Sequence, residues 1–175
     1  IGSEFGDWTW TDAGIVQLTP VHSKIGTFWT IKYFTKDQPF KWAPQKAWSG
    51  DFSGLGENTG FTISDGNAVV AEDGLYMVYI DMPADKIVIE KPTVYGIGDA
   101  FGSWDAPTTT NTEAKNLRMY ATSTLAAGVD WWKMEFNIFD GSIVYRGGGG
   151  DQDAVSVQPG AKITLDFSTD TGTIE

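Results

Sequence analysis

The sequence predicts an all-β protein built from two tandem antiparallel β-sandwich domains. The first observation is a repeat: residues 1–8, IGSEFGDW, return at residues 97–104 as IGDAFGSW, with five of eight positions identical. A second pair follows in the same order, NAVVAEDG at 67–74 and DAVSVQPG at 153–160. A duplication with a period of about 90 residues predicts one small domain used twice, at residues 1–92 and 93–175.

The other two observations are strand-like segments and regularly spaced turn signals. In order along the chain, the clearest predicted strands are 74–81, 86–90, 131–136 and 162–167, which are short, rich in β-branched and aromatic residues, and bounded by turn formers. No stretch predicts a long amphipathic helix. Turn dipeptides recur at the spacing typical of an antiparallel sandwich, at Asp65-Gly66, Asp73-Gly74, Asp140-Gly141 and Pro159-Gly160. The first half carries an insertion at 49–60, where the second half has a shorter glycine-rich loop at 146–151.

Composition excludes several classes of partner. The formal net charge of −11 repels phosphate backbones, so we expect no nucleic acid partner. The absence of cysteine removes disulfides and thiolate zinc sites. No apolar run is long enough to span a bilayer. Because the chain begins inside a repeat motif, we expect any leader or anchor to lie outside this sequence.

Catalysis and metal binding have little support in the sequence. The one histidine, His22, has no second histidine or cysteine to complete a triad or a metal site. Most carboxylates lie in turns, where Asp caps local backbone, although a glycosidase needs only two facing carboxylates, which sequence alone leaves open. Two loop pairs offer oxygen ligands without a calcium-loop spacing, namely Asp51 with Glu57 and Asp151 with Asp153. We therefore expect no enzyme, no cofactor and no metal.

The aromatic residues carry the clearest functional signal. The chain has 8 Trp, 10 Phe and 6 Tyr, which is many for two small cores. Trp29 and the adjacent Trp131 and Trp132 lie in predicted strands, and we expect at least one tryptophan of each group to contribute to the core. For the tryptophans beside glycines or in loops, both exposure and burial stay open; these are Trp8, Trp10, Trp48 and Trp104. An indole face suits the C–H face of a sugar ring, whose hydroxyl edges need polar partners, so exposed tryptophans interleaved with lysine at 40–48 indicate a carbohydrate platform.

Several short motifs, taken in order, resemble the SusE/SusF family of outer-membrane starch-binding lipoproteins from Bacteroidetes. They are the repeated Gly-x-x-Phe-Gly-x-Trp, the Phe-Lys-Trp segment with Trp48 and its glycine-rich loop, the Asn67 segment, and the stretches IVYRGGGGDQ at 143–152 and ITLDF at 163–167. The resemblance covers essentially the whole chain.

The resemblance implies a monomeric protein without enzymatic activity, exposed on the cell surface at the outer membrane. Such a protein holds polysaccharide near an importer and glycoside hydrolases, and its lipid anchor would lie outside this fragment. Each domain is expected to be a sandwich of the immunoglobulin-like or carbohydrate-binding-module type. The ligand implied is an α-glucan such as starch or maltooligosaccharide. The residues leave open another polysaccharide, such as xyloglucan, xylan or levan, or a protein-binding adhesion module.

Carried over by position, the resemblance also implies site residues. In the first half, Trp8 or Trp10 forms a platform with Trp48, and Lys41 is the hydrogen-bond donor. Lys46 and Asn67 are possible neighbours.

In the second half, Trp104 aligns with Trp8, while Tyr145 and Arg146 are expected in the region of Lys41 and Trp42. No counterpart of Trp48 is evident in the glycine loop. The second copy therefore either uses Tyr145 or is a spacer.

Overall fold

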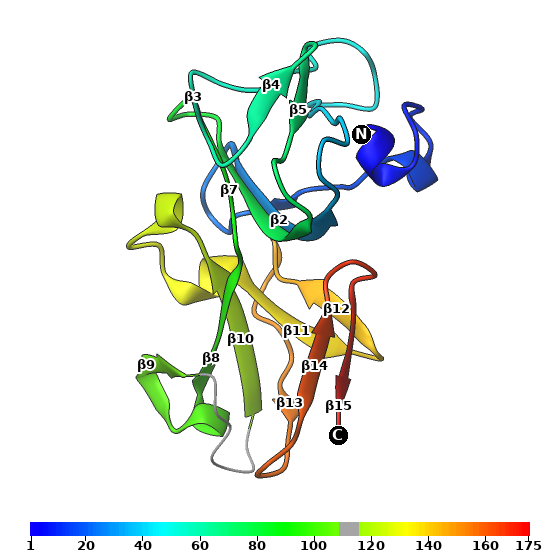
Figure 1. Ribbon diagram of the computed structural model, residues 1–175. Coiled ribbons are helices and arrows are strands. Elements are labelled where there is room, and N and C mark those ends of the chain that lie inside the picture. The colour runs from blue at the N-terminus through cyan, green and yellow to red at the C-terminus, as the bar shows by residue number, and fades with distance from the viewer. Residues whose placement is uncertain (109–115) are drawn as a thin grey trace. The chain divides into compact units, whose positions relative to one another are not determined.

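The computed structural model describes residues 1–108 and 116–175, and it shows an all-β chain (Figure 1). The predicted fold class is confirmed at that level, while the packing of sheets into sandwiches stays a prediction. The helical segments of the described residues are single 3-10 turns: η1 (Ser3–Phe5), η2 (Asp12–Gly14), η3 (Asp99–Phe101), η4 (Thr124–Ala126) and η5 (Trp131–Met134). None of the helices described is long and apolar enough to cross a membrane.

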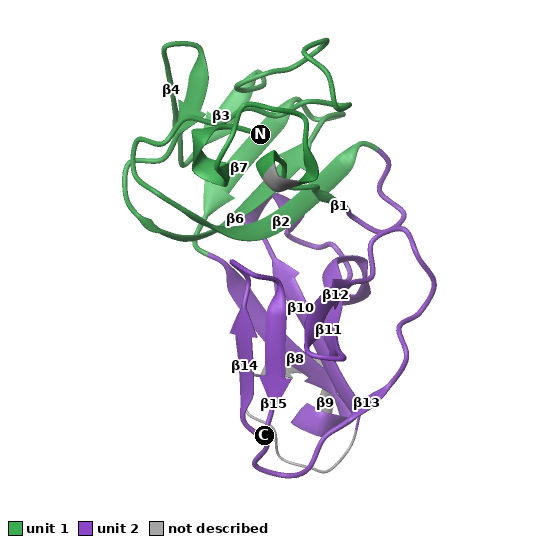
Figure 2. Ribbon diagram, turned by 90° about the vertical axis from the view of Figure 1, so that its right-hand side faces the viewer, with its two compact units in different colours: residues 1–19, 26–91 green, residues 20–25, 92–175 purple. Residues whose placement is uncertain are grey.

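The chain divides into two compact units (Figure 2). Unit 1 comprises residues 1–19 and 26–91, and unit 2 comprises 20–25 and 92–175. The expected domains, 1–92 and 93–175, differ from this division by one residue at the junction and by residues 20–25. That short segment belongs with unit 2 because the His22 backbone N–H donates to the Lys133 carbonyl at 2.9 Å.

The main sheet of unit 1 has five strands in the order β1-β2-β6-β7-β3. Their bounds are β1 (Thr19–Pro20), β2 (Thr27–Phe34), β6 (Gly74–Asp81), β7 (Lys86–Glu90) and β3 (Glu57–Thr59). β2, β6 and β7 pair antiparallel, whereas β3 runs parallel to β7. The predicted strands 74–81 and 86–90 are confirmed residue for residue.

A two-stranded hairpin and the loop at 40–52 cover one face of that sheet. The hairpin joins β4 (Thr62–Ser64) to β5 (Asn67–Val69). Its turn residues, Asp65 and Gly66, both have positive φ, 48° and 75°, as a two-residue hairpin turn requires. An antiparallel bridge between Phe40 and Ala68 joins the hairpin to the loop. The buried core between them contains Phe34, Phe40, Trp42, Phe61, Val78 and Ile80. Trp29 is fully buried, as expected.

The main sheet of unit 2 has the order β14-β15-β12-β11-β10-β8-β9, with β13 paired to β10. The bounds are β8 (Thr93–Gly98), β9 (Ser103–Thr108), β10 (Asn116–Thr122), β11 (Glu135–Phe139), β12 (Ser142–Tyr145), β13 (Val155–Ser156), β14 (Ile163–Asp166) and β15 (Thr171–Ile174). The Asp140-Gly141 turn between β11 and β12 repeats the positive-φ geometry, at 49° and 78°. The predicted strand 162–167 is confirmed as β14, shorter by one residue at each end.

The predicted strand 131–136 is wrong in its first part. Trp131–Met134 form the 3-10 turn η5, and the strand β11 begins only at Glu135. Trp131 and Trp132 are both half-buried and not in the core. In a strand, these adjacent side chains would point to opposite faces of the sheet, and one of them would enter the core. In the 3-10 turn, both indoles pack outside the core.

Candidate functional site

The repeated opening motif folds the same way in both units. The turns η1 and η3 each end at a glycine in the left-handed conformation, Gly6 with φ 97° and Gly102 with φ 76°. Phe5 packs edge-on against Phe34 at 5.6 Å, so it anchors the first turn to the core. Phe101 is buried directly over Gly96, where a Cβ would lie 2.0 Å from the ring. The motif Gly-x-x-Phe-Gly-x-Trp thus specifies a tight turn held by its phenylalanine.

This turn orients one tryptophan in each unit. The Trp8 indole Nε1 donates to Ser3 Oγ at 2.8 Å, and Trp104 Nε1 donates to Asp99 Oδ1 at the same distance. The acceptor stands five residues earlier in both cases. Because the ring nitrogen is held by its own turn, the ring face is left for other contacts.

In unit 1 three tryptophans gather, and we call them the unit 1 aromatic cluster: Trp8, Trp10 and Trp48. Trp48 is 52% exposed and stacks on Trp8 with ring centroids 6.1 Å apart and planes 27° apart. Trp10 meets Trp48 edge-on at 4.9 Å. The expected platform residues are therefore brought together, and Trp10 supports Trp48 from the side.

Lys41 and Lys46 have different surroundings. The Lys41 ammonium lies 2.9 Å from Asp51 Oδ2, with both side chains largely shielded, and its hydrogen bond lowers the pKa of the Asp51 carboxyl. Lys46 pairs with Asp12 at 2.6 Å on the open surface, and its hydrogen bond lowers the pKa of Asp12. A shielded cation with a fixed carboxylate partner is the better-ordered donor, because an exposed pair is screened by water.

Asn67 lies at the start of β5. Its side-chain amide donates to the Asp65 carbonyl at 3.1 Å, within the hairpin turn. The structure records no contact between this amide and the unit 1 aromatic cluster among the residues it describes. Its role as a ligand neighbour stays a prediction.

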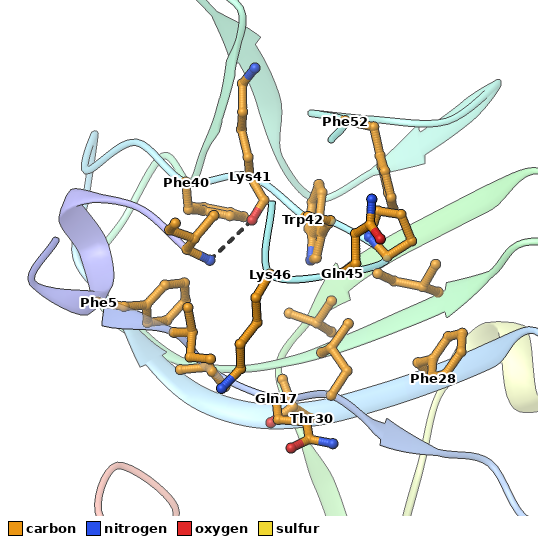
Figure 3. Close-up of a pocket in the computed structure, with 18 of the residues that line it drawn as sticks. Phe5, Gln17, Phe28, Thr30, Phe40, Lys41, Trp42, Gln45, Lys46 and Phe52 are labelled. Carbon is orange, nitrogen blue, oxygen red and sulfur yellow. Dashed lines mark hydrogen bonds between the residues drawn. The ribbon is translucent and has the colours of Figure 1, made fainter. Parts of the chain in front are cut away.

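A pocket of about 450 Å³ lies beside the cluster, between the core face of the sheet and the loop at 43–46 (Figure 3). Trp10 and Lys46 line it, but in Figure 3 the Lys41 side chain extends away from it. The pocket also borders Ile1 and Ala43. In unit 2 the equivalent place is occupied by β8, whose Gly96 and Tyr95 pair with Met119 and Tyr120 of β10. We assign no ligand to the pocket of unit 1.

In unit 2 the partner of Trp104 is Trp131. Trp104 is 47% exposed, and its ring centroid lies 6.0 Å from that of Trp131, with planes 46° apart. Sequence reasoning missed Trp131 because it was assigned to a strand. The sequence did contain a signal. Trp48-Ser-Gly-Asp-Phe52 in the first half and Trp132-Lys-Met-Glu-Phe136 in the second share a tryptophan, an acidic residue and a phenylalanine at the same spacing. This alignment puts Trp132 at the position of Trp48, with Trp131 directly before it.

Strand pairing shows which residue takes the place of Lys41 in unit 2. The Lys41 N–H donates to the Ile1 carbonyl at 2.9 Å, and Ile97, the repeat counterpart of Ile1, is paired with Arg118. The next residue agrees with this alignment. Trp42 forms an antiparallel β-bridge with Phe52, and Met119, which follows Arg118, pairs with Phe136 in the same way. Arg118 therefore corresponds to Lys41, and the carboxylates Asp51 and Glu135 correspond to each other. Tyr145 ends β12 and Arg146 follows it, one strand further along the sheet than Arg118. The Arg146 side chain nevertheless pairs with Glu135 and Asp151, the same carboxylates as Arg118.

Arg118 belongs to a four-residue charge network in unit 2, formed with Glu135, Arg146 and Asp151. Arg118 contacts Asp151 at 2.8 Å and also pairs with Glu135, while Arg146 contacts the same carboxylates at 3.3 Å and 3.1 Å. Glu135 is fully buried. The hydrogen bond with Asp151 raises the pKa of Arg118, and the same bond lowers the pKa of Asp151. Both guanidinium groups are consequently held in place.

The remaining candidates of unit 2 have structural partners. The Tyr145 hydroxyl donates to Asp170 Oδ1 at 2.9 Å, and burial raises the pKa of this half-buried phenol. The Arg146 guanidinium lies over the Trp132 ring at 5.2 Å. His22 Nδ1 lies 3.0 Å from the Gly147 carbonyl, and its ring meets Trp132 edge-on. The indole in contact with Trp104 is therefore Trp131, whereas the Tyr145 hydroxyl is bonded to Asp170.

The alternative sites can be examined in the same way. Asp51 and Asp151, the best-placed calcium candidates, pair with Lys41 and with the two arginines. Across residues 1–108 and 116–175, no three His, Asp or Glu side chains lie together in a way that could hold a metal ion.

Comparisons with known proteins place the chain in a family. The family model described as SusF/SusE starch-specific carbohydrate-binding modules (CBMs) matches residues 1–90 and 93–173. The chain belongs to the SusF/SusE family. Each SusF/SusE match contains a pair of stacked or tilted indoles, and the cations Lys41 and Arg118 pair with carboxylates at equivalent strand positions.

One relative and one solved structure support this placement. The chain is 38% identical over 186 residues to Outer membrane protein SusF of Bacteroides thetaiotaomicron, covering 90% of this chain and 38% of the relative. The crystal structure of SusF from the same organism matches 99% of this chain with a TM-score of 0.88 and 34% identity, over 46% of that chain. This SusF/SusE chain thus spans less than half the length of either.

Proposed function

We propose that this chain is a noncatalytic glycan-binding protein that captures α-glucan, as starch or maltooligosaccharide, by aromatic stacking in each unit. The observation that carries the proposal is the recurrence of one arrangement: a turn-held tryptophan, a second indole beside it, and a shielded cation paired with a carboxylate. The indoles offer an apolar face to the sugar ring, and the cation donates to its hydroxyls.

The choice of α-glucan rests on the starch-specific description of the family and is supported by the ring geometry. The planes of the paired indoles differ by 27° in unit 1 and 46° in unit 2. Consecutive rings of an α-linked glucan turn relative to one another, so angled platforms suit them better than a flat surface. Each unit, for its part, is inferred to be a sandwich of the CBM type.

The cellular setting follows from the relative's name. Since that relative is called an outer membrane protein, we propose that this protein also acts at the outer membrane, exposed on the cell surface. There it would act as a monomer that holds polysaccharide close to an importer and to glycoside hydrolases. A single shallow platform binds weakly, with a dissociation constant on the order of 10 μM to 1 mM.

Affinity electrophoresis tests the proposal. The purified chain is run through gels that contain amylopectin, with xylan, xyloglucan, levan and glycan-free gels in parallel, and with the double variant Trp48→Ala/Trp104→Ala as the matched control. We expect retardation of the wild-type chain by amylopectin alone, and none for the double variant. Retardation by another glycan would replace the ligand, and no retardation at all would favour a protein-binding scaffold.

Catalysis is tested on the same sample. Incubation of the purified chain with amylopectin should release no reducing sugar. Release that persists in the Trp48→Ala/Trp104→Ala variant would reveal a hydrolase activity separate from the platforms.

A further inference from the structure

Two tyrosines of unit 2 continue its aromatic surface beyond Trp131. We propose that Tyr95 and Tyr120 form an additional glucose-binding subsite, absent from unit 1, so that unit 2 holds a longer stretch of an α-glucan chain. This inference rests on the proposed function and concerns how many sugar residues each unit contacts.

Ring contacts connect the tyrosines to the platform. The Tyr120 ring centroid lies 6.4 Å from that of Trp131, and the Tyr95 centroid lies 5.6 Å from that of Tyr120, with planes 52° and 34° apart. Trp131 in turn lies 6.0 Å from Trp104. All three separations fall in the range of direct ring contact, so the four rings form one continuous row.

Strand geometry places the two tyrosines on the outer face of the sheet. Tyr120 of β10 stands directly opposite Tyr95 of β8. Its neighbours Met119 and Ala121 are buried, and alternation along a strand sends Tyr120 to the other face. Both tyrosines are half-buried, so part of each ring is open to solvent.

Among the described residues, no hydrogen-bond partner occupies the phenol hydroxyls of this pair. Neither makes a hydrogen bond to another residue in the described part of the chain, whereas Tyr76 and Tyr145 donate to Glu72 and Asp170. Burial and the neighbouring Tyr95 raise the pKa of Tyr120. A neutral phenol both donates and accepts, as pairing with a sugar hydroxyl requires.

Charged side chains lie beside this row of four rings. Arg118 lies two residues before Tyr120 on β10, hence on the same face, and Glu135 stands opposite Tyr120 on β11. The guanidinium that corresponds to Lys41 therefore lies alongside the extension, and a sugar ring on Tyr120 has a fixed donor at its edge.

In unit 1 the position that corresponds to Tyr120 is not aromatic. With Lys41 in the place of Arg118, the residue in the place of Tyr120 is Ala43. The third tryptophan of the unit 1 aromatic cluster, Trp10, meets Trp48 edge-on at 4.9 Å. It therefore supports the platform without lengthening it.

Calorimetric titration of the full chain with maltotriose, maltopentaose and maltoheptaose tests the inference. The Trp48→Ala variant serves as the parent, because the unit 1 site is disabled in it. Adding Tyr120→Ala should weaken maltoheptaose binding roughly three- to tenfold and leave maltotriose binding within about twofold. Tyr120→Phe, which keeps the ring, should retain most of the gain with ligand length.

Controls separate this result from a loss of folding. Tyr33→Ala removes a tyrosine of unit 1 that is 47% exposed and should change no affinity. Tyr95→Ala provides a second test if Tyr120→Ala lowers the melting temperature. The inference is overturned if Tyr120→Ala and Tyr95→Ala leave the maltoheptaose affinity unchanged while Trp104→Ala abolishes binding. The proposed function would then remain intact. No binding of any of the three sugars by the parent or the wild-type chain overturns both.

Discussion

Units 1 and 2 build the same site with different degrees of rigidity. In unit 1 a flexible lysine, Lys41, pairs with a single carboxylate, Asp51, and both remain partly accessible. In unit 2 the corresponding Arg118 shares the fully buried Glu135 with Arg146, and Asp151 closes the network from outside. A guanidinium held by two carboxylates keeps its orientation better than an ammonium on a four-carbon chain.

The two carboxylates at equivalent positions therefore differ in burial, since the Asp51 side chain is 19% exposed and that of Glu135 is fully buried. We expect Asp51 to be replaceable with little effect on folding, because its charge keeps some contact with solvent. Glu135 is not replaceable in this way, because removing its charge leaves two shielded arginines without a buried counter-ion. Mutations at these equivalent positions should therefore have unequal effects.

The largest expected effect is that of Glu135→Gln on stability. Breaking a buried ion pair by neutralising one partner costs about 3 kcal/mol of unfolding free energy. Asp51→Asn, at the equivalent position of unit 1, should change the unfolding midpoint only slightly. Urea titration followed by tryptophan fluorescence and by circular dichroism measures both. Equal midpoints for the two variants would show that the network contributes nothing to folding.

Next in size are the losses of glycan binding on truncating the exposed indoles. Trp48→Ala should weaken maltoheptaose binding in unit 1, and Trp104→Ala should weaken it in unit 2, each by about 2 kcal/mol or more, which takes a weak site out of the measurable range. For amylopectin, which can engage both units, the single losses should be larger, up to about 100-fold, because avidity is lost. Gel retardation and calorimetry measure the two effects.

Stability separates a platform role from a packing role for these tryptophans. Both side chains are about half exposed, so neither truncation should lower the melting temperature by more than a few degrees. A large drop with Trp48→Ala, in parallel with lost binding, would mean that Trp48 holds the loop at 40–52 together.

Local sequence signals predicted the parts of the fold and site that depend on local geometry. Nearby residues determine the strands at 74–81 and 86–90, the Asp-Gly turns and the opening motif. The repeat alignment likewise identified Trp104 as the equivalent of Trp8. The turn that holds each indole spans only five residues.

What escaped prediction depends on distant pairing. Arg118 becomes the counterpart of Lys41 only through the register of β8 on β10, and Trp131 reaches Trp104 only because η5 replaces the start of a strand. Strand propensity favoured the core for Trp131 and Trp132, but packing with aromatic and charged neighbours outside the core overrode it. Arg146 stays a predicted ligand residue, and its contacts in the structure are with Glu135, Asp151 and Trp132.

A smaller effect is expected in the pH dependence of stability, and it tests the charge network of unit 2. The arginine network lowers the pKa of Asp151, so the stability that Asp151 contributes is fully present above its unfolded value of about 3.9 and is lost as pH falls through the lower folded value. This contribution is constant between pH 5 and 7, so the melting temperature should show no pH dependence from Asp151 in that range. Below about pH 4 the melting temperature should fall, and the fall should be shallower in Asp151→Asn. A difference in slope between the two proteins near pH 6 would contradict this assignment.

The smallest effect separates the two lysines of unit 1. In a Trp104→Ala background, where only unit 1 binds, Lys41→Ala should weaken maltoheptaose binding by about 1 kcal/mol, since one hydrogen bond from a charged donor is lost. Lys46→Ala should change it by less than twofold, because Lys46 and Asp12 form an exposed pair whose contribution is small. Calorimetry of both variants against Lys41→Arg, which keeps the charge beside Asp51, decides whether the shielded cation is the donor. If Lys46→Ala instead shows the larger loss, the sugar lies over the mouth of the pocket beside Trp10 and not along the face shared by Trp8 and Trp48.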